Sequence, residues 1–230
     1  MSAEKPETVR PEAASRDLGL LLGILLALLG AVLLWVFRQA IAGDTSPRLA
    51  DLAAANIARS GVSNPVTAVL INFRAYDTLL ELSVLLAALL GIWSLGPAPP
   101  GFQRAGAALR GMVTWTVPLL ILTGGYMLWA GGHAPGGAFQ AGALLGAAGV
   151  ILRLAGDAGA GLPGETGQRW LLIMGIAVFL LVAVALMVAG SGFITYPPPL
   201  AKWLILMIET AATIAIGVTL AAAYVGGRPH

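Results

Sequence analysis

The sequence predicts an all-α integral membrane protein with about six transmembrane helices. Hydrophobic residues make up 58% of the chain and charged residues only 10%, a composition typical of membrane proteins and not of soluble domains. Apolar stretches of about 20 residues, the length that a helix needs to cross a bilayer, recur along the chain. Segments with glycine, proline and charged residues separate these stretches, as expected of loops.

Charge and cysteine content narrow the functional classes. The net charge is only +2, and the basic residues form no patch that would indicate nucleic-acid binding. Cysteine is absent, which excludes disulfides, thiolate nucleophiles and cysteine-based metal centres. The two histidines, His133 and His230, are too few for a haem or metal site built from several imidazoles. We therefore expect no cofactor, and we expect partners among membrane proteins, small ions and the lipid bilayer.

The first span is predicted at residues 18–41. The preceding residues 1–16 mix acids and bases and are expected to form a cytoplasmic tail. The apolar run exceeds the roughly 7 to 15 residues of a signal-peptide core, so it should be retained as a helix, with Trp35 and Phe37 at the membrane interface. Residues 43–64 then contain charges and proline, but their apolar residues recur at helical spacing, which predicts a short outer surface helix.

The second helix is expected to begin at Pro65, because proline lacks only an N–H that a first helical turn leaves unpaired. A continuous helix over 66–95 would be about 45 Å long, against a hydrocarbon core of about 30 Å. It must therefore tilt, protrude or break, and its polar cluster is the natural place for a break. The sequence GPAPP at residues 96–100 ends it.

Four further spans follow the linker at residues 98–107. They are expected at residues 111–130, 138–154, 170–190 and 200–224, followed by a short tail at 227–230. Within the fourth span, Gly142 and Gly146 form a GxxxG pattern that favours close packing of helices in lipid.

The distribution of basic residues predicts the orientation. An even number of spans places both termini on one side. With the termini inside, eight basic residues fall in inner segments and four in outer ones, Arg74 within the second span being left aside. Because inner loops are enriched in Lys and Arg, both termini should be cytoplasmic and the glycine-rich loop around His133 should face outward.

The second predicted helix carries Arg74, Asp77 and Glu81 at spacings of three and four, which place all three on one helical face. A charge near the bilayer centre costs about 2.5 to 3.5 kcal/mol on insertion scales, so such residues usually pair or line a water path. Residues 82–95 are too few to cross the membrane alone, so the span must include Glu81. For Arg74 and Asp77, an ion pair that merely orients the helix is the alternative.

Other polar residues extend this hypothesis. Glu209 is a second carboxylate well inside a predicted span, whereas Lys202 is close enough to the helix start to reach the interface. His133 could pass protons near neutral pH, or its ring could bond to the loop backbone and shape it. The residues predicted to contribute to an ion path are Arg74, Asp77, Glu81, Glu209, Lys202 and His133, with transient Na⁺ binding at Asp77 and Glu81 and no resident metal.

Two stretches resemble a known family. GHAPGGAFQAG, residues 132–142, resembles the GHxxPGGGFxxG signature of the B-type subunit, MnhB or MrpB, of multisubunit Mrp-type sodium/proton antiporters. NFRAYDTLLELSVLLAALLGIWSL, residues 72–95, resembles the DFRGFDTLGE segment at the C-terminal end of the large A subunit, which stands alone as the E subunit in membrane-bound hydrogenase relatives. The loop and packing residues of the first signature are Gly132, Pro135, Gly136, Gly137, Phe139, Gly142 and Gly146.

The match has departures. Asn72 stands where the second pattern has an acid, and Ala138 stands where the first has its third glycine. Ala75 and Tyr76 replace a glycine and a phenylalanine of the second pattern, while its other polar positions are retained as Arg74, Asp77, Thr78 and Glu81. The lost acid at residue 72 weakens any cation role for that position.

The resemblance implies a two-span unit at residues 17–97 joined to a four-span unit at 108–226. It implies a subunit of an Mrp-type cation/proton antiporter, or of a related ion-translocating complex, that packs against larger antiporter-like subunits in a bacterial or archaeal plasma membrane. Such a chain is a transport subunit rather than an enzyme. The alternatives are a purely structural docking subunit, a solitary carrier, and a serine hydrolase using Ser191 and His133, for which no further triad member is evident.

Overall fold

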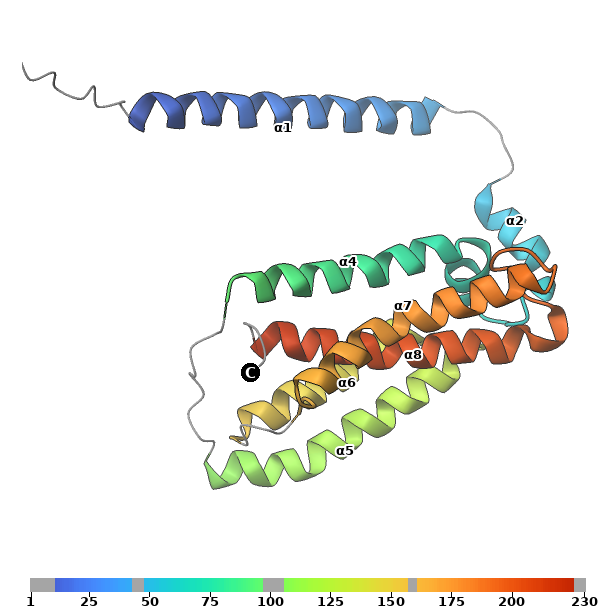
Figure 1. Cartoon of the computed structure of the whole chain (residues 1–230). Coiled ribbons are helices and arrows are strands. Elements are labelled where there is room, and N and C mark those ends of the chain that lie inside the picture. Colours follow the sequence, from blue (N-terminus) through green and yellow to red (C-terminus); the bar gives the residue numbers. More distant parts are fainter. Residues whose placement is uncertain (1–10, 43–47, 97–105, 157–160, 226–230) are drawn as a thin grey trace, which may run out of the picture. The chain divides into compact units, whose positions relative to one another are not determined.

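The computed structural model describes residues 11–42, 48–96, 106–156 and 161–225, and all regular elements within these ranges are helical (Figure 1). The chain divides into two compact units, residues 1–48 and 49–230. The first contains α1 (Pro11–Ala42). The second contains α2 (Leu49–Asn56), the 3₁₀ turn η1 (Ile57–Arg59), α3 (Pro65–Thr67), the π-helix η2 (Ala68–Phe73), α4 (Ala75–Ser94), α5 (Ala107–Ala130), α6 (Ala138–Leu154), α7 (Glu165–Val188) and α8 (Pro198–Val225).

The helices confirm the predicted class of an all-α membrane protein. Five described helices, namely α1, α4, α5, α7 and α8, are long and apolar enough to cross a membrane, and α6 is a shorter apolar helix of 17 residues. Within the described residues, each predicted span thus has a counterpart. The division into units at 17–97 and 108–226 stays a prediction, as does the orientation of the termini.

Some expectations at the ends of elements need correction or lie outside the described residues. Helix α1 begins at Pro11 and so extends through residues 11–16, ahead of the predicted first span at 18–41. The assignment of residues 1–16 to a cytoplasmic tail stays a prediction. Proline suits a first helical turn, which explains an early start. The predicted tail at 227–230, residues 1–10, residues 43–47 and most of the linker at 98–107 lie outside the described ranges.

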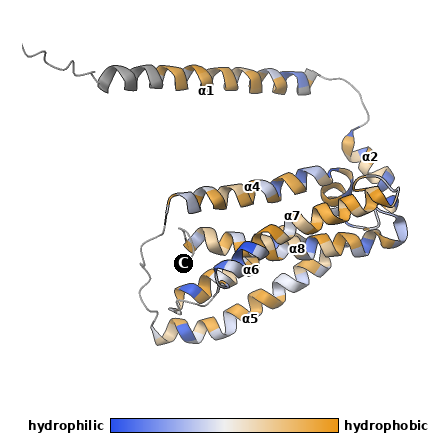
Figure 2. Cartoon of the chain, in the orientation of Figure 1, coloured by the Kyte–Doolittle hydropathy of each residue, from blue (hydrophilic) through white to orange (hydrophobic). Residues whose placement is uncertain are grey.

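The middle of helix α1, residues 19–37, is apolar around its whole circumference. Its segment Gly19–Gln39 has a mean hydropathy of 2.9, and none of it is buried. In Figure 2 the coloured ribbon of α1 is mostly in the hydrophobic colour, with hydrophilic residues near its C-terminal end. A helix without a polar face suits a lipid environment or the surface of another membrane protein.

The second predicted helix is interrupted at Arg74. Pro65 opens α3 behind the N-cap residue Asn64, as expected, and the chain then widens into the π-helix η2. Arg74 has φ −127° and ψ 34°, outside the helical region, and α4 begins at the next residue. Thr78 donates a 2.7 Å hydrogen bond from its hydroxyl to the carbonyl of Leu70. That bond supplies a partner for a backbone group near the break, as a membrane environment requires.

Helix α8 lies at the centre of the second unit. It packs against α4, α5, α6 and α7 (Figure 1). Three of its isoleucines, Ile205, Ile208 and Ile216, are almost fully buried. Because α4 and α6 both pack on α8, the positions of their facing side chains are set by this one helix.

The close contact between α6 and α8 depends on glycine residues, which have no side chain to keep the helices apart. A Cβ atom on Gly142 would stand 2.7 Å from the Cβ of Ile216, and one on Gly146 would stand 3.0 Å from the Cβ of Leu220. In the other direction, a Cβ on Gly217 would stand 2.9 Å from the Cβ of Leu145. Glycines on both helices therefore permit a closer approach than alanine would, as small residues do between helices in lipid.

We predict that Gly142→Ala lowers the free energy of unfolding of the protein, purified in mild detergent, by about 1 to 3 kcal/mol, because the added methyl group overpacks against Ile216. The melting temperature should fall accordingly. Melting followed by circular dichroism measures the change. Gly125→Ala in α5 is the control, because no heavy atom lies within 4 Å of its Cβ position. Equal melting temperatures for the two variants would contradict the packing argument.

Candidate functional site

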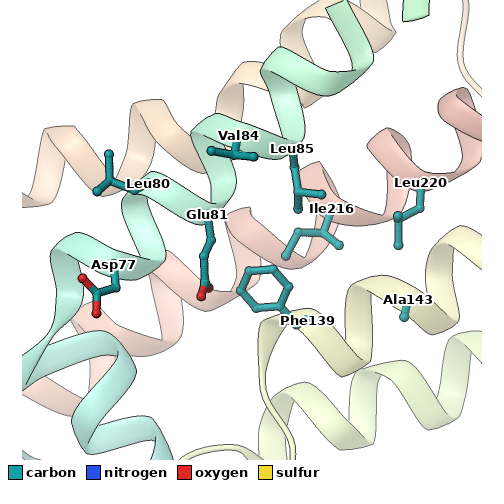
Figure 3. Close-up of a pocket in the computed structure, with 9 residues that line it drawn as sticks. All are labelled: Asp77, Leu80, Glu81, Val84, Leu85, Phe139, Ala143, Ile216 and Leu220. Atoms are coloured by element: carbon teal, nitrogen blue, oxygen red, sulfur yellow. The ribbon is translucent and has the colours of Figure 1, made fainter. Parts of the chain in front are cut away.

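A groove of about 720 Å³ opens on the surface of the second unit between α4 and α6, with α8 at its base (Figure 3). Most of its lining is apolar, and two carboxylates interrupt it. The lining residues are Asp77, Leu80, Glu81, Val84 and Leu85 from α4, Phe139 and Ala143 from α6, and Ile216 and Leu220 from α8. Figure 3 shows the Glu81 carboxylate and the Phe139 ring next to each other in the groove.

The two carboxylates of the groove differ in their partners. Asp77 forms an ion pair with Arg74, the residue at which the helix is interrupted. Their side chains are 42% and 62% exposed, so solvent or a neighbouring molecule can reach the pair. Glu81 makes no ion pair with the described residues, although it lies within the apolar span α4.

Glu81 is exposed on the surface of the chain. The sequence predicts that this carboxylate lies within the thickness of the membrane, but the described part of the chain does not bury it. The ring of Tyr76, also on α4, stacks on Phe193 of the α7–α8 loop with centroids 5.4 Å apart. The start of α4 is thus held by aromatic contact while its acidic face is left open.

The glycine-rich loop between α5 and α6 is held by α3 and its N-cap residue, Asn64. The side-chain amide of Asn64 donates to the carbonyl oxygens of Gly131 and Ala134, at 2.9 and 2.8 Å. The hydroxyl of Thr67 donates to the same Gly131 oxygen at 2.5 Å. Asn64 and Thr67 are themselves buried. Polar side chains at the start of the second helix therefore shape a loop more than 60 residues later in the chain.

Three glycines of this loop have a steric reason to be glycine. A Cβ on Gly131 would stand 2.8 Å from Gly137, and one on Gly136 would stand 2.4 Å from the carbonyl oxygen of Met127. Gly137 has φ +116°, which residues with a side chain rarely adopt. Gly132 differs, because among the described residues only a Val62 methyl group, at 3.9 Å, lies within 4 Å of its Cβ position.

His133 and Lys202 lie away from the groove lining. His133 is exposed, and its ring packs edge-on against Trp129 with centroids 4.7 Å apart. Within the described residues its ring makes no hydrogen bond, so the predicted bond to the loop backbone is not formed. Lys202 is also exposed, and its ammonium group lies 5.8 Å from the centre of the Trp203 ring. A lysine beside a tryptophan near a helix start suits the membrane interface.

Glu209 is the carboxylate that the chain does bury, with only 4% of its surface exposed. It lies within α8 and does not line the groove. The backbone N–H of Ala138 donates to its carboxylate. The structure thus brings Asp77 and Glu81 into one groove and leaves Glu209, His133 and Lys202 outside its lining.

The sequence did not point to Asn64 and Thr67, which hold the glycine loop. A signal for Asn64 was present, since Asn directly before Pro is typical of a turn that begins a helix. That signal predicts the cap to Val66, which the structure has at 3.0 Å, but not the donation to a distant loop. Thr67 gave no signal at all, because a threonine in a helical turn is ordinary.

A family model described as a domain related to the MnhB subunit of Na⁺/H⁺ antiporter matches residues 108–226, more than half of the chain. The chain belongs to this family. The resemblance of the glycine-loop signature to MnhB is thereby confirmed. Among curated proteins, no relative matches this MnhB-family chain.

Two solved structures share the fold of this MnhB-family chain. One is a chain in the Mrp complex from Dietzia sp. DQ12-45-1b, with a TM-score of 0.60 and 21% identity over 96% of this chain. This chain spans only 26% of the length of that one. The other is a chain of the membrane-bound sulfane sulfur reductase, an archaeal respiratory membrane complex, with a TM-score of 0.61, 19% identity, and coverage of 89% of this chain and 99% of that one.

We predict that Asn64→Asp loosens the glycine loop. Aspartate keeps an acceptor for the Val66 N–H but sets a carboxylate oxygen against the carbonyls of Gly131 and Ala134, at a cost of about 1 to 3 kcal/mol. Amide hydrogen exchange of the loop, measured by mass spectrometry, should accelerate. Asn56→Asp is the control, since among the described residues that half-buried side chain bonds only to Leu52 in its own helix. Unchanged exchange in the loop of Asn64→Asp would contradict the role of this side chain.

Proposed function

We propose that the chain is a membrane subunit of a multisubunit Mrp-type cation/proton antiporter, or of a related ion-translocating complex, in which Asp77 and Glu81 belong to a Na⁺ or H⁺ path. Membership of the MnhB family supports this proposal. The shared fold with a chain of the Mrp complex and a chain of a respiratory membrane complex is consistent with either kind of assembly. We place the complex in a bacterial or archaeal plasma membrane, with both termini of the chain in the cytoplasm.

The observation that carries the proposal is the exposed carboxylate of Glu81 within a helix apolar enough to span a membrane. A charge facing lipid at that depth is costly, and intramembrane charges almost always face protein or water. The groove around Glu81 would therefore be covered by another subunit of the complex. Coverage would turn an open groove into an enclosed path lined by two carboxylates, Asp77 and Glu81.

The two carboxylates would act differently. Asp77 already has a counter-charge in Arg74, and their ion pair fixes the start of α4. Glu81, one helical turn further, has no such partner among the described residues and is free to take up a proton or a hard cation such as Na⁺. Glu81 is therefore the residue that we propose exchanges the transported ion.

A second candidate function is structural docking without an ion path. The apolar segment Gly19–Gln39 of α1, which nothing in its own unit buries, favours it, because such a helix can join subunits. In that case, loss of the groove carboxylates would impair assembly before it impaired transport.

We expect the tagged chain, purified from its native membrane in mild detergent, to bring larger antiporter-like subunits with it in fixed ratio, as identified by mass spectrometry. Redox subunits among them would indicate a respiratory complex instead of an antiporter. A chain that is recovered alone and monodisperse would overturn the subunit proposal.

We expect Glu81→Gln to abolish cation/proton exchange by the reconstituted complex while the subunits still co-purify, because glutamine keeps the shape of the side chain but cannot release a proton or supply a negative charge. Ion-driven pH changes inside vesicles measure the exchange. Glu165→Gln is the control, since Glu165 pairs with Arg169 in the first turn of α7, away from the groove. Transport at the normal rate in Glu81→Gln would refute the ion-path role of that residue.

A further inference from the structure

The first turn of α6 receives its cap from another helix. The first amide groups of any α-helix have no acceptor within the helix. Here the N-cap residue is Gly137, which has no side chain to supply one. The Ala138 N–H instead donates to the carboxylate of Glu209, a buried residue in the middle of α8. A negative charge is also favourable at a helix N-terminus because of the helix dipole.

The backbone around Ala138 is shaped to receive this carboxylate. A Cβ atom on Gly137 would stand 3.0 Å from the Oε1 atom of Glu209, so glycine leaves the space that the oxygen occupies. One turn further along α8, the hydroxyl of Thr213 donates to the Ala138 carbonyl at 3.5 Å. Both polar groups of one peptide residue are therefore held by side chains of α8.

The next residue along α6 is Phe139, whose ring lines the groove beside Glu81 (Figure 3). Fixing Ala138 fixes the direction in which Phe139 leaves the helix. We infer that Glu209 is a positioning residue that holds the first turn of α6 and thereby sets Phe139 against the Asp77 and Glu81 groove. It does not itself carry the ion. This inference rests on the proposed function only in treating the groove as part of an ion path. The anchoring of α6 by Glu209 does not depend on what the groove does.

Two observations favour positioning over ion carriage for Glu209. The carboxylate does not line the groove, and it already has a hydrogen-bond donor in the Ala138 N–H. A carboxylate that serves as a helix cap needs an acceptor oxygen, and glutamine supplies one. A carboxylate that carries a proton or Na⁺ needs its charge, which glutamine lacks. The Gln variant therefore separates the two roles.

The first test is amide hydrogen exchange of the purified complex. Glu209→Ala should accelerate exchange in residues 138–141 by about fivefold or more, whereas Glu209→Gln should restore most of the protection. Thr210→Ala is the control, because Thr210 is exposed and bonds only to Leu206 in its own helix. Unchanged exchange in Glu209→Ala, or the same acceleration in Glu209→Gln as in Glu209→Ala, would overturn the inference.

A second variant keeps the test decisive if Glu209→Ala does not fold. Gly137→Ala should displace the carboxylate and accelerate the same amides, because its methyl group takes the space beside Oε1. Gly190→Ala controls for backbone strain, since Gly190 also has a positive φ, +81°, but no heavy atom lies near its Cβ position. Equal exchange in residues 138–141 of the two variants would also count against the inference.

Transport by the reconstituted complex supplies a readout that a general loss of stability would not produce. If Glu209 acts through Phe139, Glu209→Ala should lower transport several-fold in the native background and much less in Phe139→Ala, and Glu209→Gln should rescue it. Additive losses in the double variant would overturn the link to Phe139, and loss of transport in Glu209→Gln with normal exchange would show that Glu209 carries the ion. A native complex that exchanges no ions would instead refute the proposed function, while the amide measurements would still decide the anchoring.

Discussion

The close approach of α6 and α8 is the contact on which the second unit depends. Lipid surrounds membrane helices with material as apolar as their own side chains, so helices associate through close packing and polar contacts instead of hydrophobic burial. Gly142 and Gly146 on α6 and Gly217 on α8 allow that packing. The same close approach brings the first turn of α6 within reach of Glu209. It also forms two sides of the groove, with α8 at the base and α6 along one edge.

A second constraint is that backbone groups in a membrane need partners inside the protein. The chain departs from regular helix at Arg74 and in the glycine loop, and short polar side chains serve both places. Thr78 bonds to the widened turn beside Arg74, while Asn64 and Thr67 bond to the loop. The bonds of Asn64 and Thr67 tie the start of the second helix to the part that matches the MnhB family, so the two parts of the second unit are joined by polar contacts as well as by packing on α8.

The positions of the spans can be predicted because a span needs only sufficient length and apolar content, and both are properties of a continuous stretch of sequence. The predicted segment 138–154, for example, coincides with α6. For the second helix, the sequence left three outcomes open, namely tilting, protruding or breaking. The length of the segment alone does not decide among them, and the structure has the break at the polar cluster. Arg74 and Asp77 are close enough in sequence to pair on any local geometry, so their ion pair was also predictable. The helical start at Pro11 was missed because charged residues there resemble those of a tail.

What the sequence by itself determined is the class of protein, its spans, the glycine-loop signature and the presence of two carboxylates, Glu81 and Glu209, inside apolar helices. Those two residues look equivalent along the chain. Only the tertiary structure separated them: Glu81 faces the open groove, whereas Glu209 is buried against the first turn of α6. The physical reason is that hydropathy reports the average surroundings of a helix, whereas the environment of one side chain depends on which neighbouring helix its face meets.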